Sequence, residues 1–314
     1  MRPGTLALGL ALLIGAPALG YGAAGWLRSA QPPPPRTSAA RKPPPATEPR
    51  PVFVGAREAV IAAAIDDTAH LPMHRALQRL AVQWLGRGYN AFSLDRGPRE
   101  ELRIDLTRFD YGLFVEQLLA VVHSRSGSEA TSVQQRVAGH VRRLRYIDGH
   151  VSFCHRHHYF SPWAEAAERQ GYLVNLTPHL PGARSRRRSL YFVSRHAKSY
   201  EPLRDPVQRR CIEERERDLS VRQSWLPIAA IAEARPTLRS GDLYTLVSDS
   251  DGVDSSDAGV IDQVGERIAV IHAAPGEGVR RSSDLAAHAA SIPRVIGVAF
   301  YRPVPRDQSL VLEK

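Results

Sequence analysis

Residues 105–123 read DLTRFDYGLFVEQLLAVVH, and this stretch predicts the element around which the fold is built. Asp110 stands immediately before an apolar stripe and is a suitable helix N-cap. The stripe has helical spacing, with members at Phe114, Val115, Leu118, Leu119 and Val122. We therefore predict a buried helix whose first turn begins at Tyr111.

Composition limits the class of protein. The chain has 314 residues, 43% of them hydrophobic, which is enough for a substantial core. Its formal net charge of +10 suits an anionic environment such as cell-wall polymer, lipid head groups or nucleic acid. Cys154 and Cys211 are too few for a disulfide framework. A single bridge between them is an alternative outside the cytoplasm, but we predict two unpaired thiols in the core.

The N-terminal part of the chain has the composition of an export signal. Residues 1–30 carry Arg2 and then an uncharged, mostly apolar run from Thr5 to Leu27. They predict a signal peptide or a membrane anchor, and the lack of a nearby cysteine argues against a lipoprotein. Residues 31–52 are rich in proline and predict an extended linker. We expect export across an inner membrane to the periplasm or cell envelope, with one domain over residues 53–314.

Patterning within residues 53–314 predicts helices first and strands afterwards. Helices are expected over residues 57–65, 74–85, 132–143 and 205–222, a strand pair or long loop over 145–163, and a basic loop over 184–188. The last third contains short β-branched runs separated by turn residues: LYTLV, AGVI, RIAVIHAA and VIGVAFYRPV. This order predicts the α+β class, with N-terminal helices packed on an antiparallel sheet.

Six segments in this order resemble a known family. They read WLGRGYNAFSLD, RFDYGLFVEQLLAVV, RYIDGHVSFCHRHHYFSPW, SGDLYTLV, VDSSDAGVI and VIHAAP, within the range Leu77 to Pro303. Together they are similar to the N-acetylmuramoyl-L-alanine amidase-like family, a branch of the NlpC-type papain-like cysteine peptidase superfamily. The resemblance implies a papain-like α+β fold in which a nucleophile-bearing helix packs on an antiparallel sheet.

The resemblance also implies where a catalytic triad would lie. The family's nucleophile occupies the motif Phe-Asp-Cys-x-x-Phe-Val-Glu, which corresponds to residues 109–116, with Tyr111 in place of cysteine. The family's basic histidine corresponds to Asp257. The third position, often a histidine on the next strand, corresponds to His272. The nucleophile and base positions are therefore substituted.

These substitutions argue against the family's reaction. Thiol attack needs a thiolate, a base and an orienting group. A phenol has an ordinary pKa of about 10 and is a poor acyl-transfer nucleophile, and a carboxylate cannot replace imidazole near neutral pH. A hydrogen bond between Tyr111 and Asp257 would instead hold the site closed. We expect a catalytically degenerate protein that binds peptidoglycan or muropeptides, or a partner protein of the envelope. The alternatives are an active cell-wall hydrolase with rearranged residues and a structural module closed by Tyr111.

A second cluster surrounds Cys154. On a strand, His155 and His157 would share one face, a usable geometry for metal ligands. The family has a similar Arg-x-His-Tyr-Phe-x-x-Trp element, which implies instead that His158, Tyr159 and Trp163 form an aromatic, ligand-binding groove wall. We therefore expect no metal site and no cofactor. No nucleic-acid partner is expected, and membrane contact is expected only through the N-terminal segment.

Overall fold

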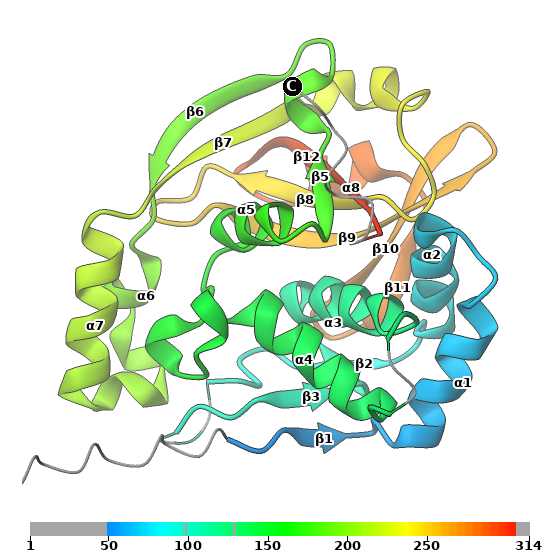
Figure 1. Ribbon diagram of the computed structural model, residues 1–314. Coiled ribbons are helices and arrows are strands. Elements are labelled where there is room, and N and C mark those ends of the chain that lie inside the picture. The colour runs from blue at the N-terminus through cyan, green and yellow to red at the C-terminus, as the bar shows by residue number, and fades with distance from the viewer. Residues whose placement is uncertain (1–48, 96, 98, 128–129, 306–314) are drawn as a thin grey trace, which may run out of the picture. The chain divides into compact units, whose positions relative to one another are not determined.

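The computed structural model describes residues 49–95, 97, 99–127 and 130–305, and Figure 1 shows their arrangement. Its α-helices are α1 (Glu58–Thr68), α2 (Met73–Gln83), α3 (Tyr111–His123), α4 (Val133–Arg145), α5 (Phe160–Arg169), α6 (Phe192–Arg195), α7 (Pro206–Arg217) and α8 (Leu285–Ser291). Its strands are β1 (Val52–Val54), β2 (Gly88–Tyr89), β3 (Arg103–Asp105), β4 (Arg108–Phe109), β5 (Leu173–Asn175), β6 (Arg184–Ser189), β7 (Ser220–Pro227), β8 (Leu243–Ser248), β9 (Ser255–Val264), β10 (Arg267–Ala274), β11 (Gly278–Ser282) and β12 (Val295–Pro303).

The main sheet of the described residues has eight strands in the order β11-β10-β9-β8-β12-β7-β6, with β5 also paired to β12. Each of these pairings is antiparallel. Two short parallel pairs, β1 with β3 and β2 with β4, lie outside it. This mixture of helices and an antiparallel sheet confirms the α+β class.

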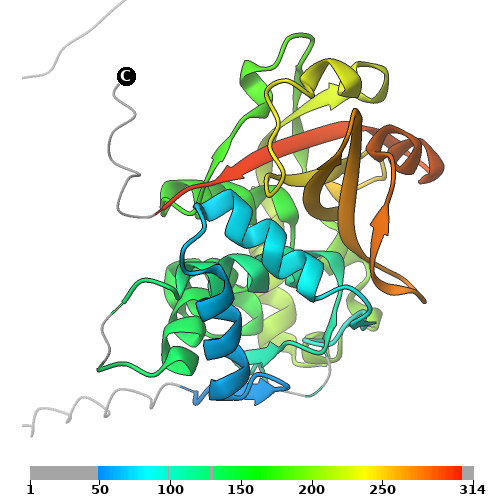
Figure 2. The same cartoon turned by 90° about the vertical axis from the view of Figure 1, so that its right-hand side faces the viewer.

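Each face of the sheet has its own core. Leu243 and Val247 of β8 point to the face that α1 to α5 cover, whereas Tyr244 and Leu246 belong to a second core on the other face. This alternation follows from the two-residue period of a strand. The second face is covered by α8 and by the 3-10 helix Ile228–Ala234. Viewed from the side in Figure 2, the cyan α2 lies next to the orange β10–β11 hairpin, and the blue α1 lies below α2.

The predicted central helix is confirmed. Helix α3 begins at Tyr111, and its N-cap Asp110 accepts a hydrogen bond from the backbone N–H of Leu113 over 2.8 Å. Residues from Leu113 to His123 are buried, because α3 packs between α2, α4 and the sheet. The expected helices over 57–65, 74–85 and 132–143 correspond to α1, α2 and α4, and the four expected strands to β8, β9, β10 and β12.

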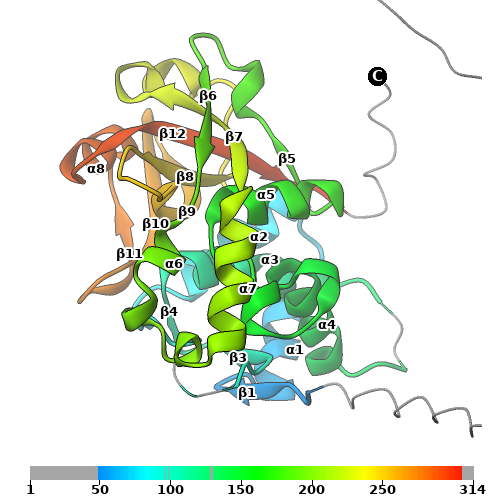
Figure 3. The ribbon, with the colours of Figure 1, turned by 90° about the vertical axis from the view of Figure 1, so that its left-hand side faces the viewer.

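Several local predictions need correction. Residues 145–163 form no strand pair beyond one isolated antiparallel bridge between Tyr146 and Arg156. They are instead a long loop, the other alternative, with the 3-10 helices Ile147–Gly149 and Phe153–His155, followed by the start of α5. The basic run of residues 184–188 is no loop but most of strand β6, whose six residues all pair with β7. The helix expected over 205–222 ends at Arg217, and β7 begins at Ser220. Figure 3 shows α7 and β7 in succession, with β6 beside β7.

The prediction of two unpaired thiols was also wrong. Cys154 and Cys211 form a disulfide with a Cα–Cα distance of 6.0 Å. The bond joins the 3-10 helix Phe153–His155 to α7, across 57 residues of sequence. Local sequence could not show this, because the two segments meet only in the tertiary fold.

The predicted signal peptide or anchor (residues 1–30) lies outside the described residues, and so does nearly all of the predicted linker (31–52), although β1 begins at its last residue, Val52. Among the residues that the structure describes, no helix is both long and apolar enough to cross a membrane.

Candidate functional site

Tyr111 lies at the junction of two hollows. Its hydroxyl donates to the backbone carbonyl of Ser255, at the start of β9, over 3.4 Å. Together with Tyr89 it lines both a cavity of about 320 Å³ and a cleft of about 760 Å³. Burial, together with the nearby carboxylates of Asp254 and Asp110, holds the pKa of Tyr111 far above its ordinary value. The phenol is therefore neutral at physiological pH and remains a hydrogen-bond donor.

Asp257 is the centre of a buried polar cluster. One of its oxygens, Oδ2, accepts from His288 Nε2 at 2.8 Å and Tyr244 Oη at 2.9 Å, and lies 3.1 Å from His272 Nδ1. Burial alone would raise the pKa of Asp257, but the hydrogen bonds from His272 and His288 outweigh it and lower the pKa. The carboxylate is therefore ionised at neutral pH.

The sheet register brings this cluster together. Tyr244 of β8 pairs with Gly259 of β9, and Gly259 pairs with His272 of β10, so the three form one row across the sheet. A Cβ on Gly259 would lie 2.9 Å from the Tyr244 ring and 2.9 Å from His272 Cβ. The glycine thus permits both side chains to approach Asp257, two residues earlier on the same face of β9.

The two predicted triad positions on the sheet therefore have different partners from those expected. Asp257 and His272 lie on adjacent antiparallel strands and line the same cleft as Tyr111. The hydrogen bond expected between Tyr111 and Asp257 is replaced by two others: Tyr111 donates to Ser255, and the phenol bound to Asp257 is that of Tyr244.

Sequence reasoning missed three members of the cluster: Tyr244, Ser282 and His288. Ser282 Oγ lies 2.9 Å from His272 Nε2. His288 is on α8, a helix that was not predicted, and its ring centroid is 4.3 Å from that of His272. The alternation of β8 could have placed Tyr244 on this face, but no local signal links α8 to β9.

The smaller cavity has an aromatic wall. The predicted groove residues His158, Tyr159 and Trp163 all line it, together with Tyr89, Phe92, Tyr111, Phe160 and Tyr200. Tyr159 donates to Glu216 and accepts from the backbone N–H of Val193, so its hydroxyl is held by the protein. Burial lowers the pKa of His158 well below its ordinary value, and its Nε2 lies 2.8 Å from the carbonyl of Phe153. The first turn of α3 opens onto this cavity at residues 110–113.

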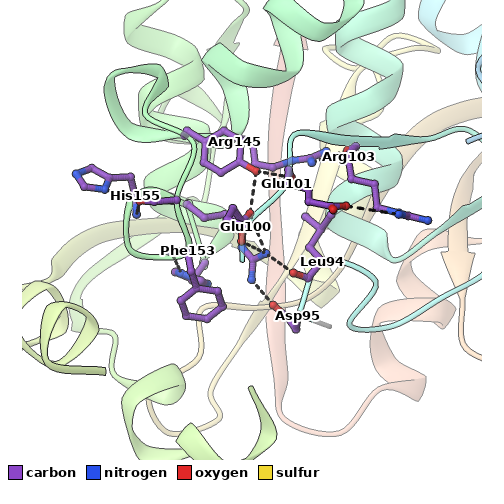
Figure 4. A network of polar contacts seen from close by, with 12 residues as sticks. Leu94, Asp95, Glu100, Glu101, Arg103, Arg145, Phe153 and His155 are labelled. Atoms are coloured by element: carbon purple, nitrogen blue, oxygen red, sulfur yellow. Dashed lines mark hydrogen bonds and ion pairs between the residues drawn. The ribbon is translucent and has the colours of Figure 1, made fainter. Parts of the chain in front are cut away.

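Buried charges support the outer wall of this cavity. Arg156 forms ion pairs with Asp95 and with Glu100, the latter at 3.2 Å, and donates to the carbonyl of Leu94. Figure 4 shows Leu94, Asp95 and Glu100 converging at this point. Arg145 pairs with Glu116 of α3 at 2.5 Å. These bonds hold Leu94, Asp95 and Glu100 to Arg156, and the end of α4 to α3.

The histidines near Cys154 do not gather into a ligand set. His155 Nδ1 lies 2.7 Å from Ser152 Oγ, while His157 lines the aromatic cavity. Burial lowers the pKa of His157 to about 4, so its ring is neutral. Among the described residues, the histidine and carboxylate group close enough to hold a metal ion is Asp257, His272 and His288.

Known proteins share this architecture. A model of the N-acetylmuramoyl-L-alanine amidase-like family matches residues 79–287, about two thirds of the chain. The chain belongs to this family. The match includes Tyr111, Asp257 and His272, and ends one residue before His288. A search of the curated proteins finds no match to this chain.

Solved structures of the same fold come from bacteria. An N-acetylmuramoyl-L-alanine amidase from Bacteroides uniformis is 23% identical, with a TM-score of 0.67 over 74% of this chain and 98% of that one. A candidate xylanase from Bacteroides fragilis is 24% identical, with a TM-score of 0.65 over 71% and 98%. A Legionella pneumophila protein of the family DUF1460 is 16% identical, with a TM-score of 0.62 over 79% and 94%. At these identities the likeness concerns the fold, and the papain-like, NlpC-type assignment stays a prediction.

Proposed function

We propose that this member of the amidase-like family is an exported envelope protein that binds peptidoglycan fragments without cleaving them by thiol chemistry. The observation that carries the proposal is the state of its cysteines. The chain contains two, and they are bonded to each other. A disulfide sulfur is not a thiolate and cannot serve as a nucleophile.

The residue at the helix N-terminus supports the same conclusion. In the family's motif the nucleophile corresponds to Tyr111, whose pKa is raised by burial. A neutral phenol attacks an acyl carbon poorly, and Asp257 is engaged by two histidines and Tyr244 rather than by Tyr111. The neighbouring motif residues are therefore kept, but the nucleophile and the base that the reaction requires are not.

The two hollows favour a ligand with both sugar and peptide parts. Aromatic side chains line the smaller cavity and suit the faces of sugar rings. The larger cleft is lined by polar groups, among them Ser283, Asp284 and Arg280, which suit a peptide stem. A net charge of +10 favours an anionic polymer. Muropeptides combine these features, and this family is named for an enzyme that acts on them.

Two features support export. Residues 1–30 have the composition of a signal peptide or anchor. A structural disulfide between Cys154 and Cys211 persists in an oxidising compartment such as the periplasm and is rare in the cytosol. The protein would act in the periplasm or cell envelope. It would contact the membrane only through its N-terminal segment.

The decisive experiment restores the missing groups. The wild-type chain should bind insoluble peptidoglycan and release no soluble product above a buffer control. Tyr111→Cys combined with Asp257→His supplies a thiol at the N-terminus of α3 and an imidazole on β9, beside His272. We expect slow release of product by this variant, abolished by iodoacetamide.

The matched control is Tyr111→Ala with Asp257→His, which opens the same space but carries no thiol. This control should still bind peptidoglycan but release no soluble product. Product release by the wild type would overturn the proposal of a non-cleaving protein. If the wild type does not bind peptidoglycan, the alternatives are favoured: the cavity and cleft bind a partner protein or have only a structural role.

Export is tested separately. Residues 1–30 fused to a reporter that is active only in the periplasm should give reporter activity, because an apolar run follows Arg2. Removal of residues 5–27 from the fusion is the control and should abolish the activity. Recovery of the full-length chain as a soluble cytosolic protein would contradict export.

A further inference from the structure

Asp257, His272 and His288 come from three different elements, β9, β10 and α8, yet their side chains meet at one point. One nitrogen from each ring and one carboxylate oxygen all lie within 4.8 Å of one another. We propose that these three residues form a binding site for one divalent transition-metal ion of the zinc class. The proposal rests on this cluster and is independent of peptidoglycan binding.

The distances within the cluster fit such an ion. Asp257 Oδ2 lies 2.8 Å from His288 Nε2 and 3.1 Å from His272 Nδ1. Ligand atoms about 2.0–2.1 Å from a tetrahedral zinc ion lie roughly 3.3 Å apart, which follows from the tetrahedral angle. The two carboxylate–imidazole distances would therefore need to lengthen by only a few tenths of an ångström. The two ring nitrogens lie within 4.8 Å of each other and would need to settle at a similar separation. Two imidazoles and one carboxylate are a ligand set that suits zinc and its neighbours.

The surroundings orient these ligands as metal sites require. His272 Nε2 contacts Ser282 Oγ at 2.9 Å, which leaves Nδ1 directed at Asp257. Ligating histidines usually use their second nitrogen for such a contact, which fixes the ring. The hydroxyl of Tyr244 donates to Asp257 at 2.9 Å and would hold the carboxylate in the same way. Gly259 leaves the space in which Tyr244 and His272 approach Asp257.

The cluster is both protected and reachable. Asp257 and His272 are 5% and 4% exposed, so bulk water competes weakly with the protein ligands. All three residues line the cleft of about 760 Å³, which gives an ion a route inward. The nearby guanidinium groups of Arg280 and Arg281 are paired with Glu277 and Asp262. Three protein ligands leave the fourth position of a tetrahedral ion facing the cleft, where water or a ligand carboxylate would bind.

The test measures metal binding directly on the full, untagged chain. After stripping with EDTA and removal of the chelator, the protein is titrated with Zn²⁺ by calorimetry and with Co²⁺ by visible absorption. We expect one ion per chain and cobalt bands typical of a low-symmetry, four-coordinate site. A wild type that takes up no stoichiometric ion overturns the proposal.

Variants locate the ion. Asp257→Asn and His288→Gln should each weaken binding by more than about 100-fold, whereas Ser282→Ala, which removes only an orienting group, should weaken it about 10-fold. The matched control is His155→Gln, because His155 and His150 form another close histidine pair, with ring centroids 4.4 Å apart. It should bind as the wild type does. Circular dichroism checks that each variant folds. Binding that survives in folded His288→Gln, or is lost in His155→Gln, would place the ion elsewhere and overturn the assignment.

Discussion

The hydroxyl of Tyr111 donates to the backbone carbonyl of Ser255, two residues before Asp257, over 3.4 Å. This contact joins the first turn of the central helix to the strand that carries the polar cluster. Because Tyr111 also lines both hollows, its ring stands between the aromatic cavity and the cleft. The ring is therefore both a wall of each hollow and a link between helix and sheet.

Substitutions at Tyr111 separate these two roles. Tyr111→Phe keeps the ring and loses one long hydrogen bond, so we expect a stability change within about 1 kcal/mol. Tyr111→Ala also removes the ring and should cost roughly 2–4 kcal/mol through lost burial and the space left behind. Urea denaturation measures both. Muropeptide affinity should be kept by the Phe variant and fall about 10-fold in the Ala variant, as expected for loss of one aromatic contact worth ~1.4 kcal/mol. Equal affinity of the two variants would show that the ring contacts no ligand.

The ion pairs of Arg156 should dominate the stability of the cavity wall. Arg156→Met leaves Glu100, whose side chain is 4% exposed, buried without its cation. Removing one partner of a buried pair typically costs about 3–5 kcal/mol. The control is Arg169→Met, which breaks an exposed pair with Glu165 and should change stability by less than about 1 kcal/mol. Equal effects of the two substitutions in urea denaturation would contradict this assignment.

The disulfide should make a large contribution to stability. A cross-link between Cys154 and Cys211 closes a loop of 57 residues in the unfolded chain. The entropy of that closure corresponds to about 4 kcal/mol. The double variant Cys154→Ala with Cys211→Ala should lose about that amount in urea denaturation without reductant. Reductant should destabilise the wild type and leave the double variant unchanged. A wild type that is insensitive to reductant would show that the bond does not form.

Asp110 should make stability depend on pH. Burial raises its pKa from the ordinary 3.8 to about 6, even though the carboxylate accepts from the Leu113 N–H. A raised pKa in the folded state means that the folded protein holds the proton more tightly than the unfolded chain. The stabilisation is therefore complete below about pH 4 and is lost as the pH rises past about 6.

The matched variant for this test is Asp110→Asn, which retains a good N-cap but does not titrate. Between about pH 4 and pH 7 the wild type should lose roughly 1–2 kcal/mol relative to Asp110→Asn, less than the full shift implies because the carboxyl borders the cavity and water screens it. Denaturation curves at several pH values give the difference. A difference that grows in favour of the wild type as the pH rises would refute the raised pKa.

Local patterns in the sequence determined much of the fold. The apolar stripe and Asp110 predict α3 to the residue at its start, because helix period and capping act within a few residues. The same holds for β8, β10 and β12, whose β-branched runs match their observed bounds closely, whereas the run AGVI covers only the middle of β9. Tyr111, Asp257 and His272, which the motif frame singles out, line one cleft.

Contacts between distant segments decided the rest. The basic residues of β6 are poor indicators of a strand, and they form one because β7 offers a paired edge. Cys154 meets Cys211, and His288 meets Asp257, only after helices α7 and α8 have packed. No periodicity or spacing in the sequence predicts these contacts, because they depend on the register of the sheet and on which helix covers which face. The sequence by itself thus determined the central helix, the strands and the tyrosine at the helix start, while the tertiary structure decided that the thiols are joined and that Asp257 lies between two histidines.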